Sequence, residues 1–131
     1  LHAGGQQTRV DSGGWFVEPT IFTGVTHDMT VAREEIFGPV LSVSTFAHAD
    51  EGIAMANDTS YGLAAYVYTQ NLSRAVRSFE ALHFGIIGIN DINPTSAAAP
   101  FGGMKESGLG REGAREGIEE YLETKLGGFS V

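Results

Sequence analysis

Apolar and polar residues alternate along the chain in short segments that predict strands separated by helices. Residues 15–22 read as two extended pieces that Pro19 separates, because proline has no N–H to donate to a strand ladder. Residues 40–46, 64–68 and 85–90 are short and apolar. The first and last of these three carry so little polarity that they suit burial on both faces of a sheet.

Helical spacing fills the intervals between these strands. Residues 26–36 are expected to form a helical turn, and Asp50 is a suitable N-cap for a helix over residues 51–57. Asn71 would cap a second helix, and a further helix is expected over residues 111–121. One face of the second helix collects the apolar residues Leu72, Val76, Phe79 and Leu82. Alternating strands and helices predict an α/β fold, with a mostly parallel sheet covered by helices in three α/β/α layers.

Two segments lack this periodicity. Residues 91–110 contain glycine, alanine and proline, and loops of this length in compact domains are usually functional. Residues 123–131 end the chain in extended fashion and mix apolar residues with two glycines. They predict a terminal strand that pairs with another sheet edge, because unpaired backbone groups and apolar side chains are costly to leave exposed. The alternative is a frayed tail, which is common at chain ends.

Composition limits the classes of function. Of 131 residues, 42% are hydrophobic and 18% are charged, which is typical of one globular domain. The net charge of −8 argues against a nucleic-acid partner, because phosphates need a basic patch. The chain has no cysteine, which excludes disulfides and thiolate metal sites. Its four scattered histidines lack the spacing of metal ligands, so no metal is expected.

The start of the chain bears on its location and completeness. It has no apolar signal segment and no run long enough to cross a membrane, so we expect a cytoplasmic protein without a membrane partner. It begins with Leu1 and no initiator methionine, as though cut from something longer. A processed precursor would look the same.

Two motifs carry the chemistry. The first is residues 34–40, Glu-Glu-Ile-Phe-Gly-Pro-Val, in which Pro39 forces Gly38 toward an extended conformation. From composition alone this segment is a solvated glutamate pair before a buried phenylalanine. The second motif is residues 100–112, in which Lys105 lies outside the spacing of a phosphate-binding P-loop. Its glycines and Lys105 are expected to pack an irregular loop that leads into a helix.

Together these motifs resemble the C-terminal motifs of the aldehyde dehydrogenases, and the resemblance covers essentially the whole chain. It looks most like succinate-semialdehyde dehydrogenases and close semialdehyde relatives. That family uses NAD or NADP and a cysteine thiolate that adds to the aldehyde; hydride then passes to the nicotinamide and water releases the acid. The resemblance implies that residues 1–122 are the C-terminal portion of the catalytic domain. Residues 123–131 would be an oligomerisation strand of a homo-oligomer, a dimer or a tetramer.

The resemblance also implies roles for individual residues. Glu35 would accept hydrogen bonds from the ribose hydroxyls of the nicotinamide half of the cofactor, and Phe37 would pack beside the nicotinamide. Ser96 or Thr95, in the loop that lines the aldehyde tunnel, would hold a substrate carboxylate. A plain turn with a side-chain-to-backbone hydrogen bond explains that pair equally well. Phe101, near the entrance of the active site, would complete the substrate side.

What the chain lacks sets its expected limit. The nucleophilic cysteine, the general base and the nucleotide-binding domain would all lie upstream of it. The chain alone is therefore expected to be inactive, and to serve as the C-terminal fragment of an enzyme that oxidises succinate semialdehyde or a related semialdehyde. The alternative is a non-catalytic truncated module that acts only in subunit association.

Overall fold

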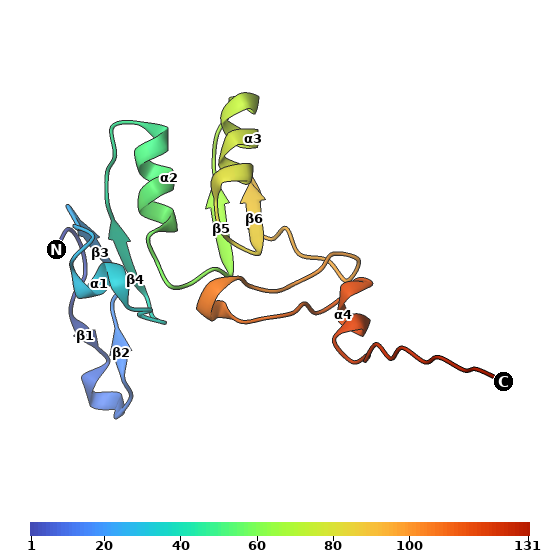
Figure 1. Cartoon of the computed structure of the whole chain (residues 1–131). Coiled ribbons are helices and arrows are strands. Elements are labelled where there is room, and N and C mark those ends of the chain that lie inside the picture. The colour runs from blue at the N-terminus through green and yellow to red at the C-terminus, as the bar shows by residue number, and fades with distance from the viewer. The chain divides into compact units, whose positions relative to one another are not determined.

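The computed structural model describes all 131 residues and divides them into two compact units, Leu1–Met55 and Ala56–Val131, each with its own strand pairing (Figure 1). The elements of the first unit are β1 (Gln7–Thr8), η1 (Val10–Ser12), β2 (Phe16–Val17), β3 (Thr20–Thr23), α1 (Thr30–Arg33) and β4 (Val40–Val43). The helix α2 (Ala49–Asn57) begins in the first unit and ends at the start of the second. The elements of the second unit are β5 (Ala64–Val67), α3 (Leu72–Ala81), β6 (Ile86–Ile89), η2 (Lys105–Ser107) and α4 (Glu116–Glu119).

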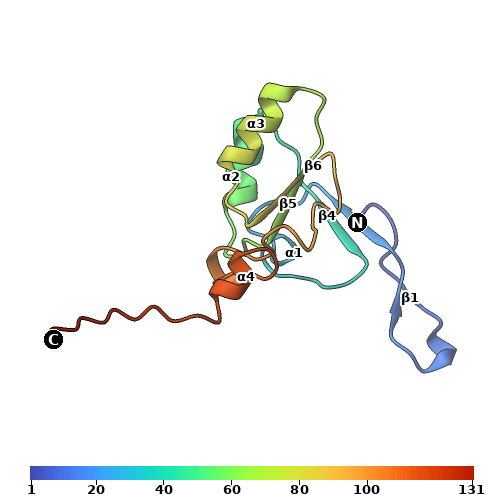
Figure 2. The same ribbon diagram turned by 90° about the vertical axis from the view of Figure 1, so that its right-hand side faces the viewer.

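The first unit pairs its strands in two ways. β1 and β2 form an antiparallel ribbon with η1 at its tip, which Figure 2 shows in profile. β3 and β4 run parallel, with Thr20 opposite Val40. The break between β2 and β3 falls at Pro19, as expected. Thr20 is buried, and its hydroxyl group is satisfied because it accepts from the Gly5 N–H at 2.9 Å and donates to the Glu18 carbonyl at 2.8 Å.

The connection from β3 to β4 contains the expected helical turn, α1. Before α1, the Thr26 hydroxyl forms a hydrogen bond to the Asp28 carboxylate and lowers its pKa. The start of α2 differs from the expectation by two residues, because the helix begins at Ala49 and Asp50 lies in its first turn instead of capping it. The Glu51 carboxylate supplies an acceptor at this end of the helix, taking the Ala47 N–H at 2.8 Å.

The second unit is built around the parallel pair of β5 and β6, with Ala64 opposite Ile86. α3 connects the two strands and lies beside them (Figure 1). Asn71 caps α3 as predicted, because its side-chain oxygen accepts from the Arg74 N–H at 2.9 Å. Leu82, just after the helix, is buried.

The fold class is α/β, as expected, and two of the three strand pairs are parallel. Each sheet has only two strands, however, and within this chain the expected burial of β4 and β6 on both faces is incomplete. Val25 and Leu82 are its only buried hydrophobic residues. The apolar face of α3 remains largely exposed at Leu72, Val76 and Phe79. Short sheets leave much of the apolar surface of the chain open to solvent.

The helix expected over residues 111–121 is wrong in extent, because α4 has only four residues. Gly113 and Ala114 have φ angles of 69° and 48°, in the left-handed region that a right-handed helix cannot include. Glu112 is also drawn away from helical geometry, because it pairs with Phe101 in an antiparallel bridge.

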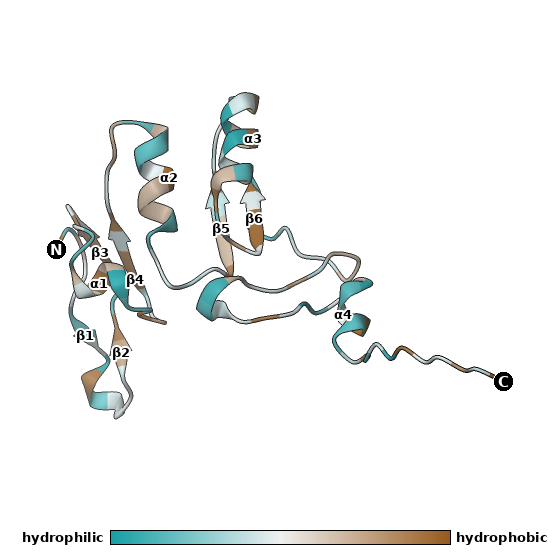
Figure 3. Cartoon of the chain, in the orientation of Figure 1, coloured by the Kyte–Doolittle hydropathy of each residue, from teal (hydrophilic) through white to brown (hydrophobic).

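The chain ends without regular structure. Residues 123–131 contain no helix or strand and form no hydrogen bond to the rest of the chain. Figure 3 shows apolar residues spaced along this tail and on β6. None of the helices has the length and hydrophobicity that a membrane-spanning segment requires.

Candidate functional site

The turn between α1 and β4 carries the first motif. The Glu34 N–H donates to the Thr30 carbonyl at 2.9 Å and closes α1. At the other end of the turn the Pro39 carbonyl accepts from the Thr20 N–H at 2.8 Å, which ties the turn to β3. Between these two anchors the Gly38 carbonyl accepts from the Val40 N–H at 2.8 Å, whereas Glu35 and Phe37 form no hydrogen bond within the chain.

Phe37 holds an unusual backbone conformation in this turn. Its φ angle is 50°, in the left-handed region, where a side chain larger than that of glycine costs roughly 1–2 kcal/mol. Its ring is 94% exposed, so the expectation of a buried phenylalanine after a solvated glutamate pair is wrong on the phenylalanine. Glu35 is exposed and forms no hydrogen bond or ion pair within the chain. A strained turn thus presents an unengaged ring and an unengaged carboxylate.

The loop that follows β6 begins with a clamp that the sequence reasoning missed. Asn90 has a φ angle of 54°. Its side chain accepts from the Thr69 N–H at 2.9 Å and donates to the Thr69 carbonyl at 2.8 Å, as a neighbouring strand would. Asparagine is enriched in the left-handed conformation, so an asparagine at the end of an apolar strand was the available signal.

The structure brings Thr95 and Phe101 to one small cavity of about 240 Å³ in the second unit. The other lining residues are Gly85, Ile86, Ile87, Pro94, Ala99 and Pro100. The Thr95 hydroxyl donates to the Asn93 side-chain oxygen at 2.8 Å. Ser96 does not line the cavity, and its carbonyl accepts from the Ala99 N–H at 3.0 Å in a turn. Of the two candidate residues, only Thr95 lines the cavity.

The second motif folds back on itself as a closed loop. Phe101 and Glu112 exchange two backbone hydrogen bonds, of 2.8 Å and 2.7 Å. The Gly102 carbonyl lies so close to Gly85 that a methyl group on Gly85 would overlap it. Glycine permits this close backbone approach because it has no Cβ, and the contact fixes the loop against the start of β6.

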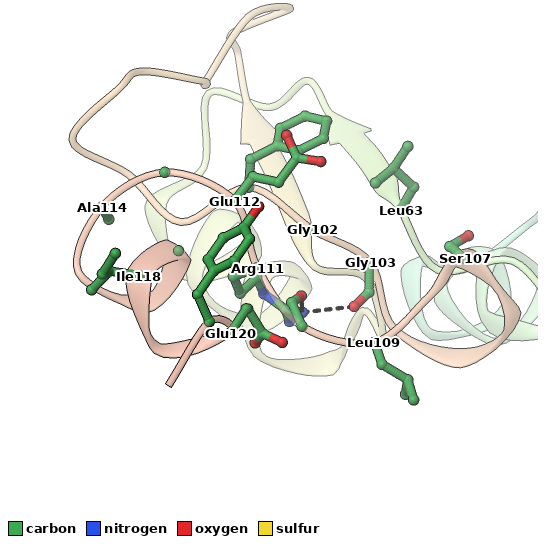
Figure 4. A pocket seen from close by; sticks show the side chains of 15 residues that line it. Leu63, Gly102, Gly103, Ser107, Leu109, Arg111, Glu112, Ala114, Ile118 and Glu120 are labelled. Carbon is green, nitrogen blue, oxygen red and sulfur yellow. Dashed lines mark hydrogen bonds between the residues drawn. The ribbon is translucent and has the colours of Figure 1, made fainter. Parts of the chain in front are cut away.

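Two cations hold this loop. The Arg111 guanidinium donates to the carbonyls of Gly103 at 2.8 Å and Gly110 at 2.6 Å, and Figure 4 shows it directed at Gly103. The Lys105 ammonium donates to the carbonyls of Asn57 at 3.0 Å and Thr59 at 3.1 Å. The packing role expected for Lys105 is therefore confirmed, and so is that of Gly102 and Gly103, whereas an added Cβ on Gly108 would meet no atom within 4 Å. Arg111 was missed, because no spacing rule marks an arginine that binds backbone carbonyls.

A larger, open cavity of about 770 Å³ lies between this loop and α4 (Figure 4). Apolar side chains such as Leu63, Leu109 and Ile118 line it together with the carboxylates of Glu112 and Glu120. The chain holds no thiol, and nowhere do three or more His, Asp or Glu side chains converge as metal ligands would. The site can therefore position groups, but it contains no nucleophile of the kind that the resemblance implies.

Comparison with known proteins agrees with these motifs. Residues 1–126 match the aldehyde dehydrogenase family. The chain is 50% identical over 125 residues to a probable succinate-semialdehyde dehydrogenase [NADP(+)] of Sinorhizobium fredii, covering 95% of this chain and 25% of the relative. It is 52% identical to a betaine aldehyde dehydrogenase of Brucella anthropi, over 86% of this chain and 23% of the relative.

A solved structure is similar as well. An indole-3-acetaldehyde dehydrogenase of P. syringae, in complex with NAD+ and IAA, superposes with a TM-score of 0.89 at 51% identity, covering 94% of this chain and 25% of that one. The chain thus spans about a quarter of the length of the curated relatives it matches. The names of these relatives cover several different aldehydes.

Proposed function

We propose that this chain, which belongs to the aldehyde dehydrogenase family, acts as the C-terminal part of an NAD(P)-dependent enzyme. That enzyme would oxidise a semialdehyde to the carboxylic acid. Its own share of the work is to orient the cofactor and to line the substrate site. The remaining part of the polypeptide would supply the thiol, since this chain has none.

The turn that carries Glu35 and Phe37 is the observation that supports this proposal. A left-handed backbone conformation at a bulky residue persists only where the surrounding structure holds it, and such residues cluster at functional sites. Here the strain leaves the Phe37 ring exposed and the Glu35 carboxylate without a partner in the chain. Both groups fit a nicotinamide nucleotide, because a carboxylate accepts from two adjacent ribose hydroxyls and an aromatic ring packs against a flat heterocycle.

The bound nicotinamide would accept the hydride that leaves the substrate. Glu35 fixes the ribose, and Phe37 limits how far the ring attached to that ribose can tilt. Backbone hydrogen bonds at Glu34 and Pro39 hold the two ends of the short turn that carries both side chains. The chain thus contributes the orientation of the nicotinamide, and correct orientation accounts for a large part of the rate of hydride transfer.

The test of this cofactor role is Glu35→Gln in the complete enzyme, with Glu34→Gln as the matched control. Loss of the carboxylate misplaces the nicotinamide, and an error near 1 Å costs on the order of 100-fold in rate. We expect single-turnover cofactor reduction to slow by about that factor, while cofactor affinity falls less. An unchanged hydride step in Glu35→Gln, or an equal loss in the control, rejects the role.

The substrate class rests on the loop after β6. We propose that Ser96 or Thr95 binds the carboxylate of a semialdehyde and that Phe101 packs against its chain, with the hydroxyl of Thr95 better placed because Thr95 lines the cavity with Phe101. A hydroxyl bonded to a carboxylate is worth about 1.5–3 kcal/mol, or roughly 10- to 100-fold.

Ser96→Ala and Thr95→Ala, compared in the complete enzyme, test this assignment. The residue that binds the carboxylate should raise KM for succinate semialdehyde by that factor and leave simple alkanals almost unchanged, because alkanals have no carboxylate. Equal losses on both substrates would indicate a structural turn instead.

A second candidate function is supported by the tail. Residues 123–131 expose Leu126 and Phe129 almost fully, which suits a module that only joins subunits.

Assays of the purified chain with NAD or NADP and several aldehydes are expected to give no turnover. Turnover that survives repurification would contradict the proposal that the thiol comes from the remaining part of the polypeptide.

The proposed assembly is a homo-oligomer, a dimer or a tetramer, in the cytoplasm. Two relatives are named as mitochondrial succinate-semialdehyde dehydrogenases, from Oryza sativa and Arabidopsis thaliana, so the compartment is a separate question from the activity. Cell fractionation followed by an activity assay tests the location.

A further inference from the structure

Lys105 occupies a position that packing alone does not require of a lysine. Its backbone is left-handed, with a φ angle of 55°, although glycine would adopt that conformation at lower cost. Its ammonium group donates to the carbonyls of Asn57 at 3.0 Å and Thr59 at 3.1 Å. It also lies 5.0 Å from the centre of the Phe84 ring, within the range of a cation–π contact.

One acceptor of this ammonium group, the Asn57 carbonyl, lies at the end of a helix, and the other, the Thr59 carbonyl, lies two residues beyond it. Asn57 is the last residue of α2, so its carbonyl has no partner within the helix. A positive charge at a helix C-terminus is favourable, because the final carbonyls carry partial negative charge. Lys105 therefore attaches the second motif to a fixed point of the second unit.

The backbone around Lys105 makes the same attachment. Met104 donates its N–H to the Gly62 carbonyl at 2.9 Å, and Glu106 donates to the Ser60 carbonyl at 3.0 Å. The Ser107 hydroxyl accepts from the Gly62 N–H at 2.9 Å. These three hydrogen bonds and the two that the Lys105 ammonium group donates form one junction, and Lys105 lies at its centre.

This junction lies next to the proposed substrate side chain. Only Gly102, Gly103 and Met104 separate Lys105 from Phe101, and the Gly102 carbonyl is pressed against Gly85. Because this connecting segment has only three residues, we expect a displacement at Lys105 to reach Phe101, which lines both cavities.

We propose that Lys105 is a positioning residue for substrate discrimination, because it sets the place of Phe101 through its ion–carbonyl contacts with the end of α2. The inference rests on the proposed substrate role of Phe101. It assigns no contact between Lys105 and the substrate.

The test uses the complete enzyme and three variants. Lys105→Met keeps most of the length of the side chain and removes its donors, Lys105→Arg restores a cation that can donate to two carbonyls, and Lys125→Met is the control, since Lys125 lies in the tail without a hydrogen bond. Amide hydrogen exchange at Met104 and Glu106 reports the junction directly, without reference to activity.

Lys105→Met is expected to raise exchange at these two amides and to change the ratio of kcat/KM between succinate semialdehyde and a short alkanal by about tenfold, mainly through KM. Lys105→Arg should recover most of the ratio. Placed in a Phe101→Ala background, Lys105→Met should add no further change in the ratio, because the side chain through which it acts is absent.

Unchanged exchange in Lys105→Met overturns the inference. So does a change in the ratio that persists at full size in the Phe101→Ala background, or one that Lys105→Arg leaves uncorrected. If Phe101→Ala alone keeps the original ratio, the proposed substrate role of Phe101 fails, whatever the exchange experiment shows at the junction.

Discussion

The closed loop from Phe101 to Glu112 and the tail of residues 123–131 are neighbours in sequence and opposites in structure. The loop has little regular secondary structure, yet a backbone bridge and the Arg111 clamp close it on itself, and the Lys105 clamp and a close glycine contact fix it to the rest of its unit. The tail forms no hydrogen bond, and its apolar side chains Leu126 and Phe129 are 97% and 95% exposed. Irregular backbone is therefore no sign of an unspecified conformation; what matters is whether its polar groups find partners within the chain.

The difference between loop and tail shows which segments find their packing partners within this chain. Hydrogen bonds and close packing of the loop are completed by residues 57–63 and 84–87 of the same unit. The tail, and the apolar face of α3, present surface that nothing in the chain covers.

Gly85→Ala should produce the largest loss of stability. The added methyl group overlaps the Gly102 carbonyl, and backbone cannot move aside as a flexible side chain can. We expect the free energy of unfolding to fall by about 3 kcal/mol, at the upper end for an overpacked site. Gly128→Ala in the tail is the control, because no atom lies within 4 Å of the added group. Denaturant unfolding of the complete enzyme compares them, and equal losses would erase the contrast between loop and tail.

Deletion of residues 123–131 should weaken assembly and leave the loop intact. If Leu126 and Phe129 pack on another subunit, the dissociation constant should rise at least about 30-fold, which is the usual effect of losing a central aromatic contact. Mass by light scattering over a dilution series measures this, with Ser130→Ala as the control. An oligomer that keeps its concentration dependence would favour the frayed tail.

Arg111→Met should have a smaller effect on stability. It removes two donors from the Gly103 and Gly110 carbonyls, at a cost of about 1–2 kcal/mol in a partly open site. The control is Arg115→Met, which removes an exposed ion pair with Glu119 of 3.1 Å and should cost no more than about 0.5 kcal/mol. Thermal unfolding of both variants shows whether a guanidinium bound to backbone carbonyls contributes more to stability than one bound to a surface carboxylate.

Much of the fold could be predicted from local chemistry. Proline chemistry located the break at Pro19, and the capping side chain of Asn71 located the start of α3. Periodicity failed where a distant contact decided the outcome: the helix expected over residues 111–121 shrank to α4 because Glu112 pairs with Phe101, a contact that no local pattern contains.

The candidate site divides in the same way. The motif containing Glu35 and Phe37 could be recognised only through its resemblance to the aldehyde dehydrogenase motifs, and the packing role of Lys105 through an irregular loop without P-loop spacing together with that resemblance. An asparagine at the end of an apolar strand indicates a left-handed residue there, but the clamp of Asn90 on Thr69 also depends on which strand lies beside β6. The roles of Glu35, Phe37, Thr95, Ser96 and Phe101 toward ligands stay predictions.

The left-handed backbone of Phe37 has a consequence for attempts to improve the protein by selection. Glycine or asparagine would adopt this conformation more cheaply, so a library screened only for heat resistance should replace Phe37 and retain the fold. A library screened for turnover should keep the aromatic ring and tolerate the unfavourable dihedral. The two screens would therefore select different residues at position 37. The residue recovered there would show whether stability or turnover had been selected.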